Sequence, residues 1–167
     1  AIVWQDRRTA DFCDELRYAG YEDAVRDATG LLLDPYFSAT KMRWLLDQEP
    51  AVAMAASAGR LAFGTIESWL VFKLTEGAAH LTDAGNASRT LLLPLTGATW
   101  DQELCDLFGV PQAALPQVVD NAGEFGSTSL FGAPIPITGL AGDQQAATIG
   151  QGCLAPGETK ATYGTGA

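Results

Sequence analysis

The sequence predicts an α/β fold, because short strand candidates alternate with amphipathic helices along the chain. The apolar stretch 135–141, which begins after a proline, is typical of a short buried strand, and the Pro156-Gly157 turn leads into a second strand candidate over 159–163. Between such stretches, apolar residues recur at the spacing of one helix face. No internal repeat, linker or low-complexity tract divides the 167 residues, so we expect one domain over 1–167.

The first half of the chain predicts mainly helices. A strand candidate over 2–4 precedes a helix over 9–19, in which apolar residues recur at helical spacing until a glycine stops it. Further helices are expected over 38–49, 51–58 and 65–76, each followed by a glycine or proline.

The second half predicts a mixed pattern of shorter elements. We expect a short helix over 101–108 and a strand over 117–122. A strand over 135–141 then leads to a small-residue helix over 144–151 that has Asp143 at its start. After a Pro-Gly turn, the last strand is expected over 159–163.

Four side chains that could carry chemistry are assigned structural roles. Trp44, Trp69 and Trp100 lie on predicted helix faces or at a strand end, and we expect them in the core. His80 is the single histidine and has no nucleophile elbow near it, so a surface or capping role is expected.

Composition excludes several classes of partner. Twenty acidic and ten basic residues give a formal charge of −10, which opposes binding to nucleic acid and to anionic membranes. No apolar run approaches the length of a membrane span, so no membrane insertion is expected. The three cysteines match neither a disulfide framework nor a zinc spacing, which favours a reducing cytoplasmic location and buried thiols.

Two short motifs carry the strongest chemical information. Gly142-Asp143-Gln144-Gln145 sets a carboxylate at a predicted helix start, and Tyr163-Gly164-Thr165-Gly166 follows twenty residues later as a glycine turn. A carboxylate facing the positive end of a helix dipole stays ionised and can accept a hydroxyl proton or bind a metal. A threonine between glycines can offer its hydroxyl and backbone N–H groups to a phosphate. The plain alternative is that Asp143 only caps its helix and the glycines only turn the chain.

Several further segments, together with these two motifs, resemble the FGGY carbohydrate kinase family. The resemblance spans nearly all 167 residues and rests on the following stretches: Ala1-Ile2-Val3-Trp4-Gln5-Asp6-Arg7-Arg8-Thr9, Asp34-Pro35-Tyr36-Phe37-Ser38, Phe63-Gly64-Thr65-Ile66-Glu67-Ser68-Trp69-Leu70, Thr82-Asp83-Ala84-Gly85-Asn86-Ala87-Ser88-Arg89-Thr90, Gly142-Asp143-Gln144-Gln145-Ala146-Ala147 and Ala161-Thr162-Tyr163-Gly164-Thr165-Gly166.

The resemblance implies a ribonuclease H-like, actin-like ATPase fold, present here as the later part of the family's N-terminal domain. It also implies ATP-dependent phosphorylation of glycerol to sn-glycerol 3-phosphate, because segment 34–38 has the form found in glycerol-phosphorylating members. We expect these 167 residues alone to be inactive, since the opening phosphate-binding hairpin and the second domain of the family are not among them.

The resemblance also assigns roles to individual residues. It implies that Asp143 is the catalytic base and sits beside Mg²⁺. Tyr36 and Gln144 are expected to hydrogen-bond the hydroxyls of glycerol, and Trp4 to form a flat wall against its carbons. Thr165 and Gly166 are expected to contact the phosphates of ATP or ADP.

Three readings remain open at this point. Besides a glycerol-phosphorylating enzyme, the chain could belong to a kinase of the same family that acts on xylulose or gluconate. It could also belong to a non-catalytic, actin-like assembly protein. Self-association of the whole protein into a homo-oligomer is compatible with each reading.

Overall fold

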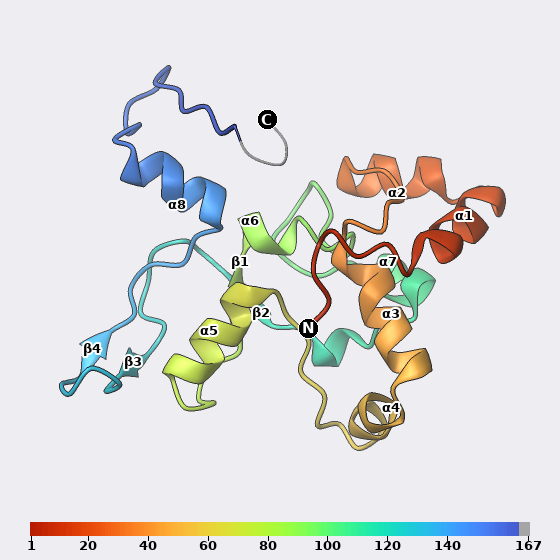
Figure 1. Ribbon diagram of the computed structural model, residues 1–167, viewed down its shortest axis with the longest axis horizontal. Helices are drawn as coiled ribbons and strands as arrows, with labels where there is room; N and C mark the ends of the chain where they lie inside the picture. The colour runs from red at the N-terminus through yellow and green to blue at the C-terminus, as the bar shows by residue number, and fades with distance from the viewer. Residues whose placement is uncertain (164–167) are drawn as a thin grey trace.

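Five helices gather on one side of the molecule and enclose the main apolar core (Figure 1). The structure is a computed structural model and describes residues 1–163. The five helices are α1 (Ala10–Tyr18), α2 (Glu22–Thr29), α3 (Ser38–Gln48), α4 (Pro50–Ser57) and α7 (Gln102–Phe108). Val25, Leu92, Cys105 and Phe108 are fully buried in this cluster, which is the larger of the two apolar clusters in the described residues.

Glycines end these helices where the backbone turns left-handed. Gly30 (φ 74°) follows α2 and Gly109 (φ 64°) follows α7, at values that only glycine adopts at little cost. At the other end of α7, the Asp101 carboxylate accepts from the Leu104 N–H at 3.0 Å. The predicted helices over 9–19, 38–49, 51–58 and 101–108 are confirmed, whereas α2 was not predicted.

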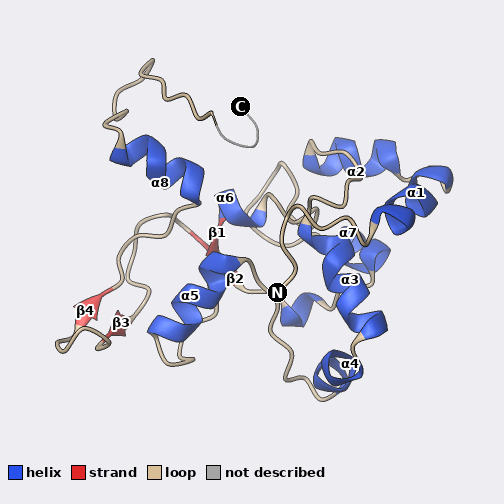
Figure 2. Cartoon of the chain, in the orientation of Figure 1, coloured by secondary structure: helices blue, strands red, loops and turns tan. Residues whose placement is uncertain are grey.

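A small parallel sheet forms the second part of the fold, at the centre of the view in Figure 2. Strand β1 (Leu81–Asp83) pairs with β2 (Gln117–Val119), so that Asp83 lies opposite Val119. Helices α5 (Ile66–Leu74) and α6 (Ala84–Ala87) pack beside β1. The helix predicted over 65–76 is therefore confirmed, and the strand predicted over 117–122 is confirmed over its first three residues.

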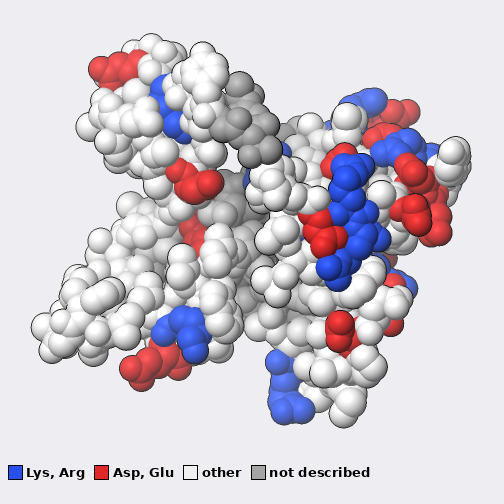
Figure 3. Space-filling view, in the orientation of Figure 1, with Lys and Arg blue, Asp and Glu red and all other residues white. Residues whose placement is uncertain are grey.

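A two-stranded hairpin and the last helix lie beyond this sheet. Strand β3 (Ser127–Thr128) pairs antiparallel with β4 (Ile135–Pro136), and α8 (Asp143–Gly150) follows. In Figure 3 charges of both signs cover the helical side, whereas the hairpin side is largely uncharged. A small apolar cluster of Val71, Phe125 and Leu140 joins the segments just before and just after the hairpin to α5.

Three predicted strands are corrected by the structure. Residues 2–4 form no strand, and Val3 is exposed with its carbonyl accepting from Lys41 Nζ at 2.7 Å. Of 135–141, only the first two residues form a strand, and within 159–163 no strand is found. A strand needs a regular ladder of hydrogen bonds to a partner, and among the described residues no strand runs beside 2–4 or 159–163. Residues 137–140 do exchange backbone hydrogen bonds with 121–126, but apart from one bridge between Ala122 and Gly139 this pairing is irregular.

The tryptophan predictions are only partly correct. Trp100 packs against the main core and donates from Nε1 to the Pro116 carbonyl at 2.7 Å. Trp44 is half-buried beneath the Arg8 guanidinium, 4.4 Å from the ring centre, and Trp69 is exposed and stacked on Phe72. Trp69 lies on α5, which also exposes Ile66 and Leu70, so apolar periodicity alone did not separate the two faces of that helix.

The cysteine and histidine predictions are confirmed where the structure tests them. Cys13 and Cys105 are free and buried, and burial raises the pKa of each thiol to about 11, which keeps both unreactive. Cys153 is free and half-buried. His80 shares a 2.7 Å hydrogen bond with the Phe63 carbonyl, which is a structural role.

Two buried acids sit at the end of β1. Glu67 Oε2 accepts from the Asp83 N–H at 2.8 Å and from Thr82 Oγ1 at 3.1 Å, while Glu67 Oε1 is buried without a partner in the described residues. Burial raises the pKa of Glu67, the hydrogen bond from the Asp83 N–H opposes that shift, and the negative Asp83 carboxylate adds to it. Glu67 is therefore easier to protonate in the folded protein than in the unfolded chain.

Replacing the fully buried Phe108 tests the helical core. Phe108→Ala removes a side chain at the centre of the cluster and should cost about 3–5 kcal/mol of stability. Phe131→Ala, at a position 72% exposed, should change stability by less than about 0.5 kcal/mol. Urea unfolding of both variants measures the difference, and equal midpoints would contradict this assignment of the core.

Replacing Glu67 tests the raised pKa. Since the folded protein binds the Glu67 proton more tightly, the wild type should lose stability as pH rises from the ordinary pKa of 4.5 to the raised folded value. Glu67→Gln cannot lose a proton, so its melting temperature relative to that of the wild type should rise as the pH increases through this range. Melting curves from pH 4 to 7 measure this, with the exposed Glu15→Gln as the control for losing one carboxyl. Parallel curves for Glu67→Gln and wild type would contradict the assignment.

Candidate functional site

Helix α8 begins at the carboxylate that the sequence singled out. Gly142 is its N-cap, with φ −61° and ψ 155°, and Asp143 occupies the first turn. Asp143 is exposed, and its Oδ1 accepts from the Gln144 N–H at 2.9 Å. The predicted helix start is confirmed, and it presents an accessible carboxylate beside the positive end of the helix dipole.

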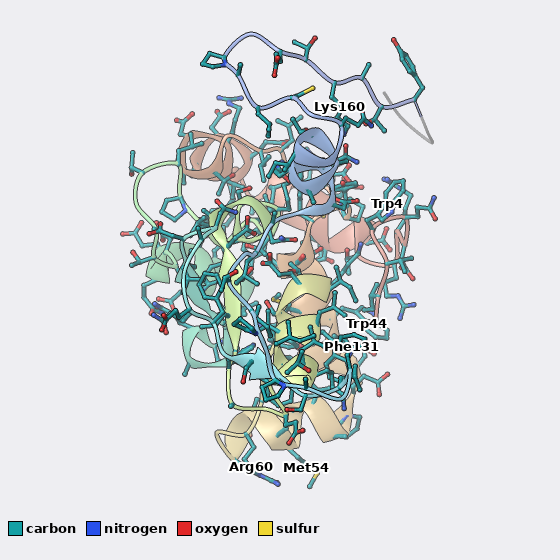
Figure 4. All side chains as sticks on the ribbon, turned by 90° about the vertical axis from the view of Figure 1, so that its left-hand side faces the viewer. Trp4, Trp44, Met54, Arg60, Phe131 and Lys160 are labelled. Carbon is teal, nitrogen blue, oxygen red and sulfur yellow. The ribbon has the colours of Figure 1, made fainter. Side chains whose placement is uncertain are left out.

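The segment after α8 folds back onto the next side chain of the helix. Gln144 Oε1 accepts from Lys160 Nζ at 2.7 Å and from Thr162 Oγ1 at 3.3 Å. Figure 4 shows Lys160 beside α8. The Lys160 ammonium group is thus bound to the residue that follows Asp143, and such a cation can neutralise an oxyanion. Sequence reasoning missed Lys160, although its position between the two motifs could have suggested it.

Trp4 and Tyr36 form a second group with the neighbouring aromatic residue. The ring centres of Trp4 and Tyr36 are 5.5 Å apart, and those of Tyr36 and Phe37 are 5.1 Å apart. The Arg89 guanidinium lies 4.9 Å from the centre of the Phe37 ring and 5.8 Å from that of Tyr36. Trp4 and Tyr36 remain 49% and 44% exposed, so the group offers an apolar face and a phenolic hydroxyl to a ligand.

An open hollow of about 950 Å³ lies beside Tyr36 and Arg89. Its other walls come from α1, α2 and the 30–34 segment, where Arg17 pairs with Glu22 at 2.6 Å. Asp143 and Gln144 do not line it. The hollow therefore adjoins the aromatic group and not the carboxylate.

The structure thus brings the predicted residues together as two pairs. Asp143 and Gln144 are adjacent on α8, and Trp4 and Tyr36 touch each other. No hydrogen bond or aromatic contact within residues 1–163 joins one pair to the other. The predicted phosphate contacts Thr165 and Gly166 lie outside the described residues.

A buried polar network binds the backbone just before Asp143, because Asn121 Nδ2 donates to the Leu140 carbonyl. Asp83 accepts at Oδ1 from the backbone and side-chain nitrogens of Asn86, and at Oδ2 from Asn121 Nδ2, all at 2.8 Å. Burial raises the pKa of Asp83, but the hydrogen bonds from Asn86 and Asn121 outweigh it and hold the pKa below its ordinary value. The sequence showed Asp83 and Asn86 in one motif without indicating this role.

The described part of the chain offers single acidic residues and not a preformed metal cage. Within residues 1–163 no group of three or more His, Cys, Asp or Glu side chains is placed to bind a metal. Asp143 is an exposed, hard oxygen ligand of the kind that binds Mg²⁺ together with substrate phosphates. Within the same residues no helix is long and apolar enough to cross a membrane.

Comparison with known proteins places the chain among glycerol kinase sequences. It is 62% identical over 169 aligned residues to a glycerol kinase of Rhodospirillum rubrum, covering 100% of this chain and 34% of that protein. A glycerol kinase of Alcanivorax borkumensis is 61% identical, over 99% of this chain and 34% of its own length. The chain spans about a third of the length of these relatives.

Solved structures of sugar and polyol kinases share the fold. The Plasmodium falciparum glycerol kinase with ADP matches with a TM-score of 0.84 and 36% identity, over 90% of this chain and 31% of that one. A xylulose kinase from Rhodospirillum rubrum matches with a TM-score of 0.76 and 25% identity, over 90% and 31%. The actin-like kinase fold expected from the resemblance is therefore confirmed, as a partial α/β unit.

A family model gives the same result along most of the chain. The model of the N-terminal domain of the FGGY family of carbohydrate kinases matches residues 1–150, which include both the aromatic group and α8. The chain therefore belongs to the FGGY family of carbohydrate kinases.

Proposed function

We propose that the complete gene product is an ATP-dependent glycerol kinase that converts glycerol to sn-glycerol 3-phosphate. The observation that carries the proposal is the exposed Asp143 carboxylate at the start of α8, in a chain 62% identical to a glycerol kinase along its whole length. The 167 residues would be part of one domain, the later portion of the N-terminal FGGY domain.

Asp143 would act as the general base. Its carboxylate would accept the proton of a terminal hydroxyl of glycerol while that oxygen forms a bond to the γ-phosphorus of ATP and ADP leaves. In a loose phosphoryl-transfer transition state the proton leaves late, so orientation matters more than a high proton affinity. The exposed carboxylate at the start of α8, which accepts a hydrogen bond from the Gln144 N–H, supports this role.

The remaining site residues would bind and position the two substrates. Tyr36 would hydrogen-bond a glycerol hydroxyl, Trp4 would cover the carbon chain, and Gln144 would contact a second hydroxyl. Thr165 and Gly166 would contact the nucleotide phosphates. Lys160, which hydrogen-bonds the adjacent residue Gln144, would approach the transferring phosphoryl group.

Asp143 would hold Mg²⁺ as a carboxylate ligand, together with the phosphates of ATP. When bound there, the ion would neutralise charge that develops on the phosphate oxygens. We further propose a cytoplasmic enzyme, for which the buried free thiols of Cys13 and Cys105 are suitable. Assembly of the complete protein into a homo-oligomer is part of the same proposal.

Glycerol is favoured over larger sugars by the comparisons. Relatives called glycerol kinase are 58–62% identical to the chain, whereas the similar xylulose and gluconate kinase structures are 17–25% identical. Isothermal titration of the complete gene product with glycerol, xylulose and gluconate tests the choice. Saturable heat with glycerol alone is expected, and none of the three would bind to a non-catalytic assembly protein.

Removing the charge of Asp143 should abolish most turnover. Asp143→Asn keeps the shape of the side chain but cannot accept the proton, so kcat of the complete enzyme should fall by about 100-fold or more. Glycerol binding should remain detectable by titration. Asp23→Asn, which removes an exposed acid on α2, should leave kcat unchanged. Near-normal turnover of Asp143→Asn would show that another group is the base.

Removing the hydroxyl of Tyr36 should weaken glycerol binding instead. Tyr36→Phe retains the ring contacts with Trp4 and loses one hydrogen bond, so KM for glycerol should rise about 2- to 10-fold. Tyr18→Phe, at a position 92% exposed, serves as the control. Steady-state assays with varied glycerol separate KM from kcat, and an unchanged KM would remove Tyr36 from the substrate site.

A further inference from the structure

We propose that Asp83 is a positioning residue for Asp143, because it fixes, through Asn121 and Asn86, the backbone segment 140–142 that leads into α8. The inference rests on the proposed function of Asp143 as the base. It goes beyond that function because it assigns the correct positioning of the Asp143 carboxylate to a second, buried carboxylate that touches neither substrate.

Asp83 and Asn121 meet at one edge of the parallel sheet. Asp83 is the last residue of β1 and is 1% exposed, and Asn121 comes two residues after β2. Since β1 and β2 run parallel, their carboxyl ends lie at the same edge, where α/β folds place their functional groups. The sheet therefore supplies a fixed platform for both side chains.

Asn121 joins Asp83 to the segment before α8. Its Nδ2 donates to Asp83 Oδ2 at 2.8 Å and to the Leu140 carbonyl at 2.7 Å, which uses both amide hydrogens. The Leu140 N–H in turn donates to the Asn121 carbonyl at 2.9 Å. Both backbone polar groups of Leu140 are thus bound by one residue, three positions before Asp143.

Asn86 forms the second connection. Asp83 Oδ1 orients the Asn86 side chain, whose Nδ2 lies 3.6 Å from where a β-carbon on Gly142 would stand. Gly142 is buried, although its neighbour Asp143 is exposed. The amide therefore lies near the residue that directly precedes Asp143, and a side chain at Gly142 would meet both Asn86 and Gln145.

The backbone of Asp83 is itself held by Glu67. Its N–H donates to Glu67 Oε2, so the backbone that carries the carboxylate is tied to α5. Hydrogen bonds to an ionised acceptor are roughly twice as strong as neutral ones. An asparagine at position 83 would lose this charge and would turn an NH₂ group toward one of its present donors.

We expect Asp83 to affect the position of the Asp143 carboxylate and not the affinity for glycerol. A misplacement of a catalytic group by about 1 Å can cost on the order of 100-fold in rate. Loosening the 140–142 segment should therefore lower kcat while leaving glycerol affinity, which depends on several other side chains, nearly unchanged.

The test compares Asp83→Asn and Asn121→Ala in the complete enzyme. Each should lower kcat by about 10- to 100-fold, with the Kd for glycerol from titration within about threefold of wild type. Because both act through one chain of contacts, the double variant should be no more than about twofold slower than the slower single variant. Additive losses, or a kcat near wild type in Asn121→Ala, would overturn the proposal.

Thr29→Val provides a control for lost buried hydrogen bonds. The Thr29 hydroxyl donates to the Val25 carbonyl at 2.7 Å and accepts from the Leu31 N–H at 3.2 Å, within the helical cluster. This variant should lower the melting temperature and leave kcat within about twofold of wild type. A similar fall of kcat in Thr29→Val would mean that general destabilisation explains the effect, which would also overturn the proposal.

Amide hydrogen exchange gives a readout that needs no substrate. In Asn121→Ala, residues 140–142 should exchange faster than in wild type, whereas α1 and α2 should not change. Unchanged exchange at 140–142 would overturn the anchoring. If the wild-type enzyme did not phosphorylate glycerol, the proposed function would fail separately, and the exchange comparison would still decide whether Asp83 anchors this segment.

Discussion

The position of α8 depends on the hydrogen bonds that the buried Asp83 carboxylate accepts. This carboxylate accepts three hydrogen bonds at 2.8 Å while almost completely removed from solvent. A buried charge is tolerated only when its hydrogen-bonding capacity is satisfied, so these partners are required for the fold as well as for the site. The same atoms that stabilise Asp83 thereby fix the approach to Asp143.

The two residue pairs of the proposed site depend on different supports. Trp4 and Tyr36 rest on the loops next to α3 and the helical core, whereas Asp143 and Gln144 rest on the small sheet and the segment that follows the hairpin. Each support has its own apolar cluster. The geometry of a substrate complex therefore depends on how these two units sit relative to each other.

The sequence predicted the helices and the helix start at Asp143 well, because apolar periodicity and glycine or proline stops are local features. It overestimated the strands, since pairing depends on a partner that local pattern does not reveal, as residues 2–4 and 159–163 show. It also placed Trp69 in the core, because the outer face of α5 is apolar and therefore resembles a buried face in the sequence. The network of Asp83, Asn86 and Asn121 joins residues up to 38 positions apart, so no local pattern could have shown it.

The internal contacts of Gln144 bear on how a ligand would enter. A side-chain carbonyl oxygen has two lone pairs, and Gln144 Oε1 already accepts from both Lys160 and Thr162. In the proposed complex, a substrate hydroxyl can donate to this oxygen only after one of those donors leaves. Binding of the ligand would then require that a donor in the 160–162 segment dissociates from Gln144. The free-energy cost of this dissociation would make the observed affinity weaker than the intrinsic affinity.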